Sequence, residues 1–89
     1  MTLERWKQFS KRQQLLFVSS ELERARVWQR EDEEKFKGAL ERGIELVDLM
    51  TLDQQWKDNL PMILKLREEM AKFHAGENKT DIKALCQAL

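Results

Sequence analysis

Large apolar residues recur at intervals of three and four positions along almost the whole chain. This spacing matches the 3.6 residues in one turn of an α-helix, so such side chains line one face of each helix. No segment alternates β-branched and polar residues as a half-buried strand does. The sequence therefore predicts an all-α fold, in which helices bury their apolar faces against one another.

Residues that cap helices divide this pattern into segments. Thr2 and Ser10 are typical N-caps, which predicts a short first helix and a long second helix over 11–29. A third helix is expected to begin at Glu31 or Asp32, because acidic residues in a first turn interact favourably with the helix dipole. Its expected apolar stripe consists of Phe36, Ala39, Leu40, Gly43, Val47 and Met50.

The rest of the chain predicts a fourth helix and a short fifth one. Asp53 can cap the segment that leads into the fourth helix, and Pro61 either occupies its first turn or kinks a longer helix. Gly76 suits the C-terminal end of this helix, and Thr80 can cap the last one. Three long helices, short connections and a short helix at each end predict an up-and-down antiparallel bundle, a single domain over residues 1–89.

Gly43 interrupts the stripe of the third helix with the smallest residue. A glycine inside a helix costs about 1 kcal/mol relative to alanine, so its presence needs a structural reason. Together with Ala39 one turn earlier, it lets a neighbouring helix approach closely. We therefore expect Gly43 to have a packing role.

The second helix carries more apolar surface than one stripe facing the core can use. Its main stripe consists of Leu15, Val18, Leu22 and Ala25. Two further lines are formed by Leu16 with Val27 and by Phe17 with Trp28, each pair eleven residues apart. A helix that is apolar on most of its sides is either central in its bundle or covered by a partner chain.

The size of the chain favours the second of these explanations. A domain of 89 residues buries only about 60% of the surface of its unfolded chain, so self-association is a natural route to further burial. We expect Leu16, Phe17, Val27 and Trp28 to form an interface in a homodimer or with another helical protein. The chain is accordingly interpreted as a non-enzymatic protein–protein interaction module.

Charges are balanced overall but unevenly placed. Sixteen acidic residues balance sixteen basic ones, so the composition does not predict binding to nucleic acid. Residues 1–30 carry seven bases and three acids, whereas residues 31–58 carry nine acids and four bases. We expect the basic second helix to lie antiparallel to the acidic third helix, with their charges paired at the rim.

Residues suited to catalysis or metal binding are few. His74 and Cys86 are the only members of their types, whereas zinc sites need several Cys or His ligands and di-iron bundles need two histidines. We therefore expect no metal site, and the absence of a Gly-rich phosphate loop predicts no cofactor of that kind. Cys86 falls on the apolar side of the last helix, where a thiol acts as a small hydrophobic residue.

One segment offers an alternative function. Arg67 and His74 are seven residues apart, which places them on one side of the fourth helix, two turns from each other. This spacing is similar to the Arg-x(4–6)-His motif of HEPN ribonucleases, which are helical bundles that build their active cleft across a dimer. The resemblance implies RNA cleavage or nucleotide binding through Arg67 and His74, although Glu68 stands where a polar Asn, Asp or His is common in that family.

The sequence also bears on location. The first seven residues carry charges where a signal peptide needs an apolar segment, and the longest apolar run, Leu15 to Val18, has four residues. A membrane span needs about 20 apolar residues, so we expect none. With a lone cysteine that has no partner for a disulfide, the sequence predicts a cytoplasmic protein.

Overall fold

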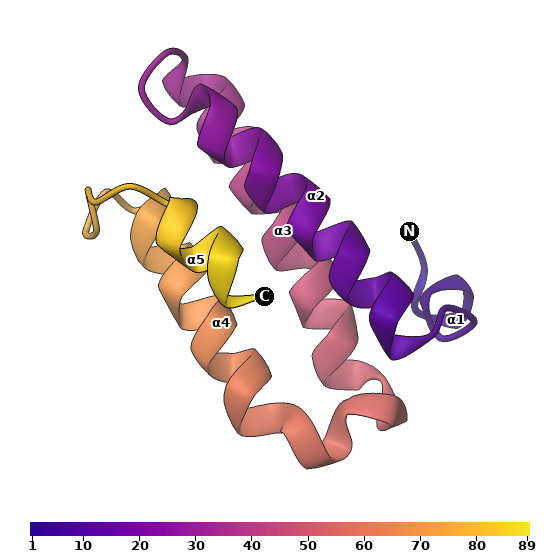
Figure 1. Cartoon of the computed structure of the whole chain (residues 1–89). Helices are drawn as coiled ribbons and strands as arrows, with labels where there is room; N and C mark the ends of the chain where they lie inside the picture. Colours follow the sequence, from indigo (N-terminus) through magenta and orange to yellow (C-terminus); the bar gives the residue numbers. More distant parts are fainter.

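The computed structural model describes residues 1–89 and confirms the all-α bundle. Three long helices run antiparallel in chain order, and a short C-terminal helix lies between the second and the fourth (Figure 1). No strand is present. The elements in order are α1 (Leu3–Trp6), α2 (Lys11–Trp28), α3 (Glu33–Leu52), the 3-10 helix η1 (Gln54–Asn59), α4 (Leu60–His74) and α5 (Lys83–Ala88).

The predicted caps begin the first three helices. The Thr2 hydroxyl accepts a hydrogen bond from the Arg5 amide at the start of α1. Ser10 and Gln13 form a capping box at the start of α2, in which each side chain accepts from the backbone N–H of the other. Asp32 caps α3, which resolves the choice between Glu31 and Asp32. These bonds satisfy amides that have no partner inside their helices.

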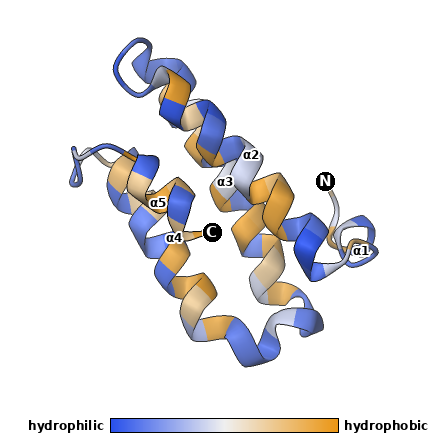
Figure 2. Ribbon diagram, in the orientation of Figure 1, coloured by the Kyte–Doolittle hydropathy of each residue, from blue (hydrophilic) through white to orange (hydrophobic).

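Apolar faces of all the long helices meet in one core. Every residue of the stripe predicted for α3 is buried, which confirms the periodicity on which the prediction rests. The hydropathy colouring shows polar residues in the turn between α2 and α3 and in the loop before α5 (Figure 2). The buried apolar core consists of Trp6, Val18, Leu22, Ala25, Phe36, Ala39, Leu40, Val47, Met50, Trp56, Ile63, Leu66, Met70, Phe73 and Ile82.

Gly43 of α3 lies close to side chains of both α2 and α4. A Cβ atom placed on Gly43 would lie 2.6 Å from Cε of Met70 in α4 and 3.5 Å from Cβ of Glu21 in α2. The first of these distances is well inside van der Waals contact, so a larger residue would displace the Met70 side chain. The predicted packing role of Gly43 is therefore confirmed.

Pro61 and Gly76 mark the two ends of helix α4. Pro61 lies in the first turn of α4, where its missing N–H costs nothing, so it does not kink a longer helix. At the other end Gly76 adopts a φ of 77°, and the Glu77 amide donates to the Lys72 carbonyl at 2.9 Å. This Schellman arrangement confirms Gly76 as the residue that ends α4.

The start of α5 differs from the prediction. Thr80 does not cap this helix, because its hydroxyl and its amide are both bound to the side chain of Asn78. The helix begins at Lys83, whose amide donates to Asp81 at 2.9 Å. The preceding loop is fixed from α2 instead, where the Gln29 side chain donates to the Thr80 carbonyl at 2.7 Å and accepts from the Ile82 amide at 2.9 Å.

The expected charge pairing between α2 and α3 is wrong. No ion pair joins a basic residue of 1–30 to an acidic residue of 31–58. The one ion pair between these helices has the opposite sense, from Arg42 of α3 to Glu21 of α2 at 2.9 Å. Acidic residues of α3 pair instead with α4, because the edge of α3 that carries them faces α4.

None of the helices combines the length and the apolar character that crossing a lipid bilayer requires.

Candidate interaction surface

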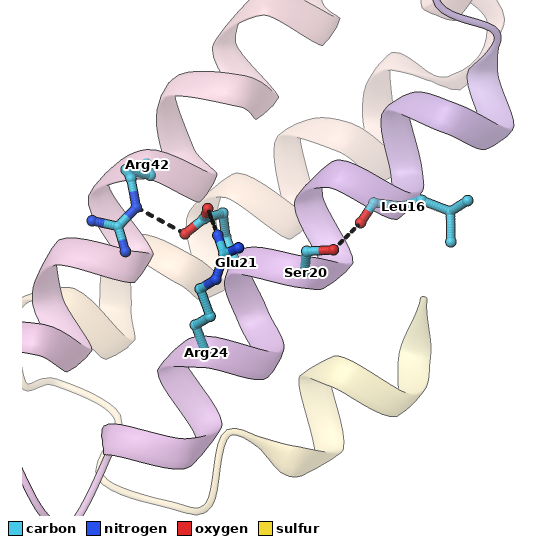
Figure 3. A network of polar contacts seen from close by, with 5 residues as sticks. All are labelled: Leu16, Ser20, Glu21, Arg24 and Arg42. Atoms are coloured by element: carbon cyan, nitrogen blue, oxygen red, sulfur yellow. Dashed lines mark hydrogen bonds and ion pairs between the residues drawn. The ribbon is translucent and has the colours of Figure 1, made fainter.

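The outward side of α2 exposes two of the four residues predicted to form an interface. Leu16 is 58% exposed and Val27 is 61% exposed, and neither packs against the core. Their separation of eleven residues corresponds to about 16 Å along the helix axis. Leu16 points away from the ribbon of α3 (Figure 3). Ser20 follows Leu16 by one turn, and its hydroxyl donates to the Leu16 carbonyl at 2.9 Å. We call the line formed by Leu16, Ser20, Glu23 and Val27 the outer row of α2.

The other two predicted residues lie on a flank of the same helix. Phe17 is 38% exposed, and its ring centroid lies 5.0 Å from that of Phe9 and 6.0 Å from that of Trp6. Trp28 is half-buried against the core, and Lys35 Nζ lies 4.2 Å from its ring centroid. Part of the surface of these two aromatic side chains is thus covered by other residues of the same chain. The four predicted residues therefore divide into an apolar pair that is more than half exposed, Leu16 and Val27, and an aromatic pair that contacts other residues of the chain, Phe17 and Trp28.

A buried carboxylate holds the opposite side of α2 in place. Glu21 is only 8% exposed and accepts hydrogen bonds from Arg42 of α3, at 2.9 Å, and from Arg24 on its own helix (Figure 3). Hydrogen bonds between ionised partners are about twice as strong as neutral ones, and both carboxylate oxygens are used here. The outer row is therefore carried by a helix that is fixed to its neighbour at mid-length.

Arg67 and His74, the residues of the alternative function, are each held by a carboxylate of α3. Arg67 Nε donates to Asp48 at 2.6 Å, and His74 Nε2 lies 3.0 Å from a carboxylate oxygen of Glu41. The hydrogen bond and the charge of Asp48 raise the pKa of Arg67. Glu41 and Asp48 are also seven residues apart, so α3 and α4 are joined by two contacts that lie two helical turns apart. This arrangement accounts for Arg67 and His74 as residues that join helices.

The Cys86 thiol and possible metal ligands are the other candidates for a reactive site. Burial raises the pKa of the Cys86 thiol, and the negative charge of Glu23 adds to this effect. The thiol lies 3.4 Å from the Leu22 carbonyl as a hydrogen-bond donor. A raised pKa disfavours the thiolate, which is the nucleophilic form of cysteine. No group of three His, Cys, Asp or Glu residues lies close enough together to hold a metal ion.

A buried polar cluster was not found from the sequence. Gln14 is fully buried and donates to Asp53 at 2.8 Å, while its oxygen accepts from the Trp56 indole at 2.6 Å. Its amide also donates to the carbonyls of Trp6 and Phe9, which attaches the first ten residues to the bundle. The signal that could have revealed it is the position of Gln14, four residues before Val18 on the core-facing stripe. A polar residue in such a position needs buried partners.

A small apolar hollow lies where α2, α3, α4 and α5 meet. Its volume is about 180 Å³, comparable with cavities of about 150 Å³ that accept one benzene-sized group. Met50 and Met62 contribute flexible walls that adapt to different shapes. The whole lining comprises Leu15, Met50, Met62, Ile63, Lys65, Leu66, Glu69, Leu85, Ala88 and Leu89.

No family model, curated protein sequence or solved structure matches the chain. Its function is therefore argued from the geometry and chemistry of its own residues. Among these, the outer row of α2 is a surface that the core of the bundle leaves uncovered.

Proposed function

We propose that this chain is a non-enzymatic protein–protein interaction module that binds a second copy of itself or another helical protein through the outer side of α2. The observation that carries this proposal is the exposure of Leu16 and Val27, which belong neither to the buried core nor to the residues packed against it. Because part of each side chain is already buried, covering one contributes about 1–2 kcal/mol to binding before the entropic cost of association.

The geometry of the outer row suits a helical partner. Leu16 and Val27 lie three turns apart on one line, so a second helix laid along α2 contacts both. Between them stands Ser20, whose small side chain allows the two helices to come close. Recognition of a helix by apolar anchors on successive turns is a recurrent mode of protein binding.

The proposal also places the chain in the cytoplasm. Cys86 is the only cysteine and is a free thiol, so this domain contains no disulfide. Free thiols persist in reducing compartments, of which the cytoplasm is the principal one.

Crosslinking from defined positions tests the proposal. A photo-reactive phenylalanine analogue is placed at Leu16 in one variant and at Leu64 in another, and both are irradiated in cells that produce the chain. Leu64 is a matched control, because it is a leucine of similar exposure (54%) on α4. We expect covalent protein adducts from position 16 and few from position 64. Equal yields, or no adduct from position 16, would contradict the proposal.

A second variant distinguishes the ribonuclease alternative from the interaction module. Arg67 and His74 each contact a carboxylate of α3, and these contacts account for both side chains without an RNA ligand. In the interaction module, changing both residues to alanine preserves the adducts formed from position 16, since neither residue lies on α2. Cleavage of RNA by the purified chain that disappears in His74→Ala would instead establish the alternative.

A further inference from the structure

The two ends of α2 carry complementary pairs of residues. Arg12 precedes Leu16 by four positions, and Glu31 follows Val27 by four positions. Residues four apart on a helix lie on the same face, so Arg12 extends the outer row at its first end. At the other end Glu31 and Val27 line one shallow hollow, which places Glu31 beside Val27 although it lies just beyond the helix.

Neither terminal charge has a salt-bridge partner within the chain, although Arg26 and Arg30 line the same hollow as Glu31. Arg12 and Glu31 are both exposed, and neither takes part in an ion pair. They lie at opposite ends of a helix of 18 residues, about 27 Å long, so they cannot reach each other. Their charges are available to a partner that covers the outer row.

We propose that the partner is a second copy of this chain, laid antiparallel along α2 about a two-fold axis that passes between Ser20 and Glu23. In this register Leu16 packs against the partner's Val27, and Arg12 binds the partner's Glu31. Each contact occurs twice because a two-fold interface is self-complementary. The inference rests on the proposed function and adds to it the identity of the partner and the register of the two helices.

The centre of the proposed interface is free of uncompensated charge. There Ser20 faces the partner's Glu23, and the small side chain of Ser20 leaves room for the longer Glu23 at the usual helix separation of about 8–10 Å. Glu23 already forms an ion pair with Arg26 at 3.1 Å, which reduces the repulsion between the two Glu23 carboxylates of the dimer. Next to Glu31, Arg30 faces the partner's Gln13, whose side chain carries no charge.

The charge distribution of the whole chain favours a second copy over an unrelated helix. Residues 1–30 have a net charge of plus four (7 − 3) and residues 31–58 a net charge of minus five (4 − 9). No ion pair within the chain joins the bases of the first segment to the acids of the second. An antiparallel two-fold arrangement brings the basic beginning of each α2 to the acidic turn of the other. Such complementarity fixes orientation and register.

A charge-exchange experiment tests the register. Arg12→Glu alone places two acidic residues together at both ends of the dimer, and Glu31→Arg alone places two basic residues together. We expect each single variant to dimerise about tenfold more weakly than the wild type in sedimentation equilibrium, since two exposed pairs are reversed. An equimolar mixture of the two variants restores opposite charges at both ends. We therefore expect the mixture to form a heterodimer with wild-type affinity.

Two controls separate this pattern from general effects of charge. Glu45→Arg on α3 and Lys57→Glu on η1 make matched changes at exposed positions that form no ion pair, and we expect them to leave the dissociation constant unchanged. Thermal unfolding by circular dichroism verifies that every variant is folded. If each single variant weakens the dimer but the mixture does not restore it, the register is wrong.

The failure of this inference can be distinguished from failure of the proposed function. A wild-type chain that stays monomeric at all concentrations, but forms adducts with another protein from position 16, overturns the homodimer and leaves the interaction module intact. A chain that is monomeric and forms no adducts overturns both. A dimer whose affinity responds to none of the charge changes overturns the inference alone.

Discussion

Asp53 shows how a single buried side chain fixes the N-terminal part of the molecule. Burial on its own raises the pKa of this carboxyl, but hydrogen bonds from Gln14 and from the amide and side chain of Gln55 outweigh that effect, and the pKa lies below its ordinary value. The Gln55 side chain also donates to the carbonyls of Lys7 and Phe9. The ionised carboxylate therefore organises the contacts that hold α1 against the bundle.

We predict that acid weakens the fold through Asp53. Because its pKa is lowered in the folded chain, the carboxylate contributes stability above the ordinary pKa of about 4, and this contribution disappears as the pH falls through the folded value. Asp53→Asn is expected to be less stable near pH 7 and to lose less stability between about pH 5 and about pH 2 than the wild type. Urea unfolding at several pH values measures this difference. Asp58→Asn, at an exposed position without an ion pair, is the control, and identical pH profiles for all three proteins would contradict the prediction.

At the scale of the helices, periodicity predicted those parts whose stability comes from burial along one face. In α3 the stripe was correct residue by residue, because its spacing follows the turn of the helix and one side faces the core. The start of α5 was not predictable in the same way. Thr80 has the character of an N-cap, but a local turn with Asn78 engages its hydroxyl, and local propensity cannot decide between such competing partners.

The sequence also predicted part of the interface on α2. Apolar lines on α2 indicated surface beyond the core, and the structure exposes Leu16 and Val27. Sequence periodicity could not reveal that Phe17 packs against Trp6 and Phe9, because those contacts depend on where α1 folds back. Nor could it reveal that Arg67 lies beside Asp48, since pairing across helices depends on how they rotate against each other.

The packing of α3 against α4 leads to a prediction that compares two glycines. Gly38 and Gly43 both lie inside α3, so replacing either with alanine gains about 1 kcal/mol of helix propensity. At Gly38 the added methyl group meets only the end of the Arg42 side chain at 3.5 Å, whereas at Gly43 it meets Met70 at 2.6 Å. Met70 is fully buried, so moving it disturbs the core. We expect Gly38→Ala to stabilise the protein by about 1 kcal/mol in urea unfolding and Gly43→Ala to stabilise it less or to destabilise it. Equal gains at both sites would show that Met70 moves without cost.

At the scale of the whole molecule, the ion pairs leave the segregation of charge intact. On one edge of α3, Arg67 of α4 neutralises Asp48, and His74 of α4 lies within hydrogen-bond distance of Glu41. Arg12 at the beginning of α2 and Glu31 in the turn after it form no ion pair, and they lie at opposite ends of α2 in an elongated molecule of 36 × 23 × 20 Å. In the proposed antiparallel dimer this separation brings the basic end of each α2 to the acidic end of the other, where opposite charges attract.

This charge separation predicts how salt acts on self-association. The screening length falls from about 10 Å at 0.1 M salt to about 3 Å at 1 M, so ion pairs at the rim of the dimer weaken as salt is added. Raising NaCl from about 0.05 M to about 0.5 M is expected to increase the dissociation constant severalfold in sedimentation equilibrium. The neutral variant Arg12→Gln/Glu31→Gln is expected to dimerise more weakly at low salt and to respond little to its addition. Contacts between Leu16 and Val27 alone would give no such increase in the dissociation constant, because apolar association does not weaken when charges are screened. Association of the wild type that strengthens with NaCl would therefore exclude the ion pairs as the source of its orientation.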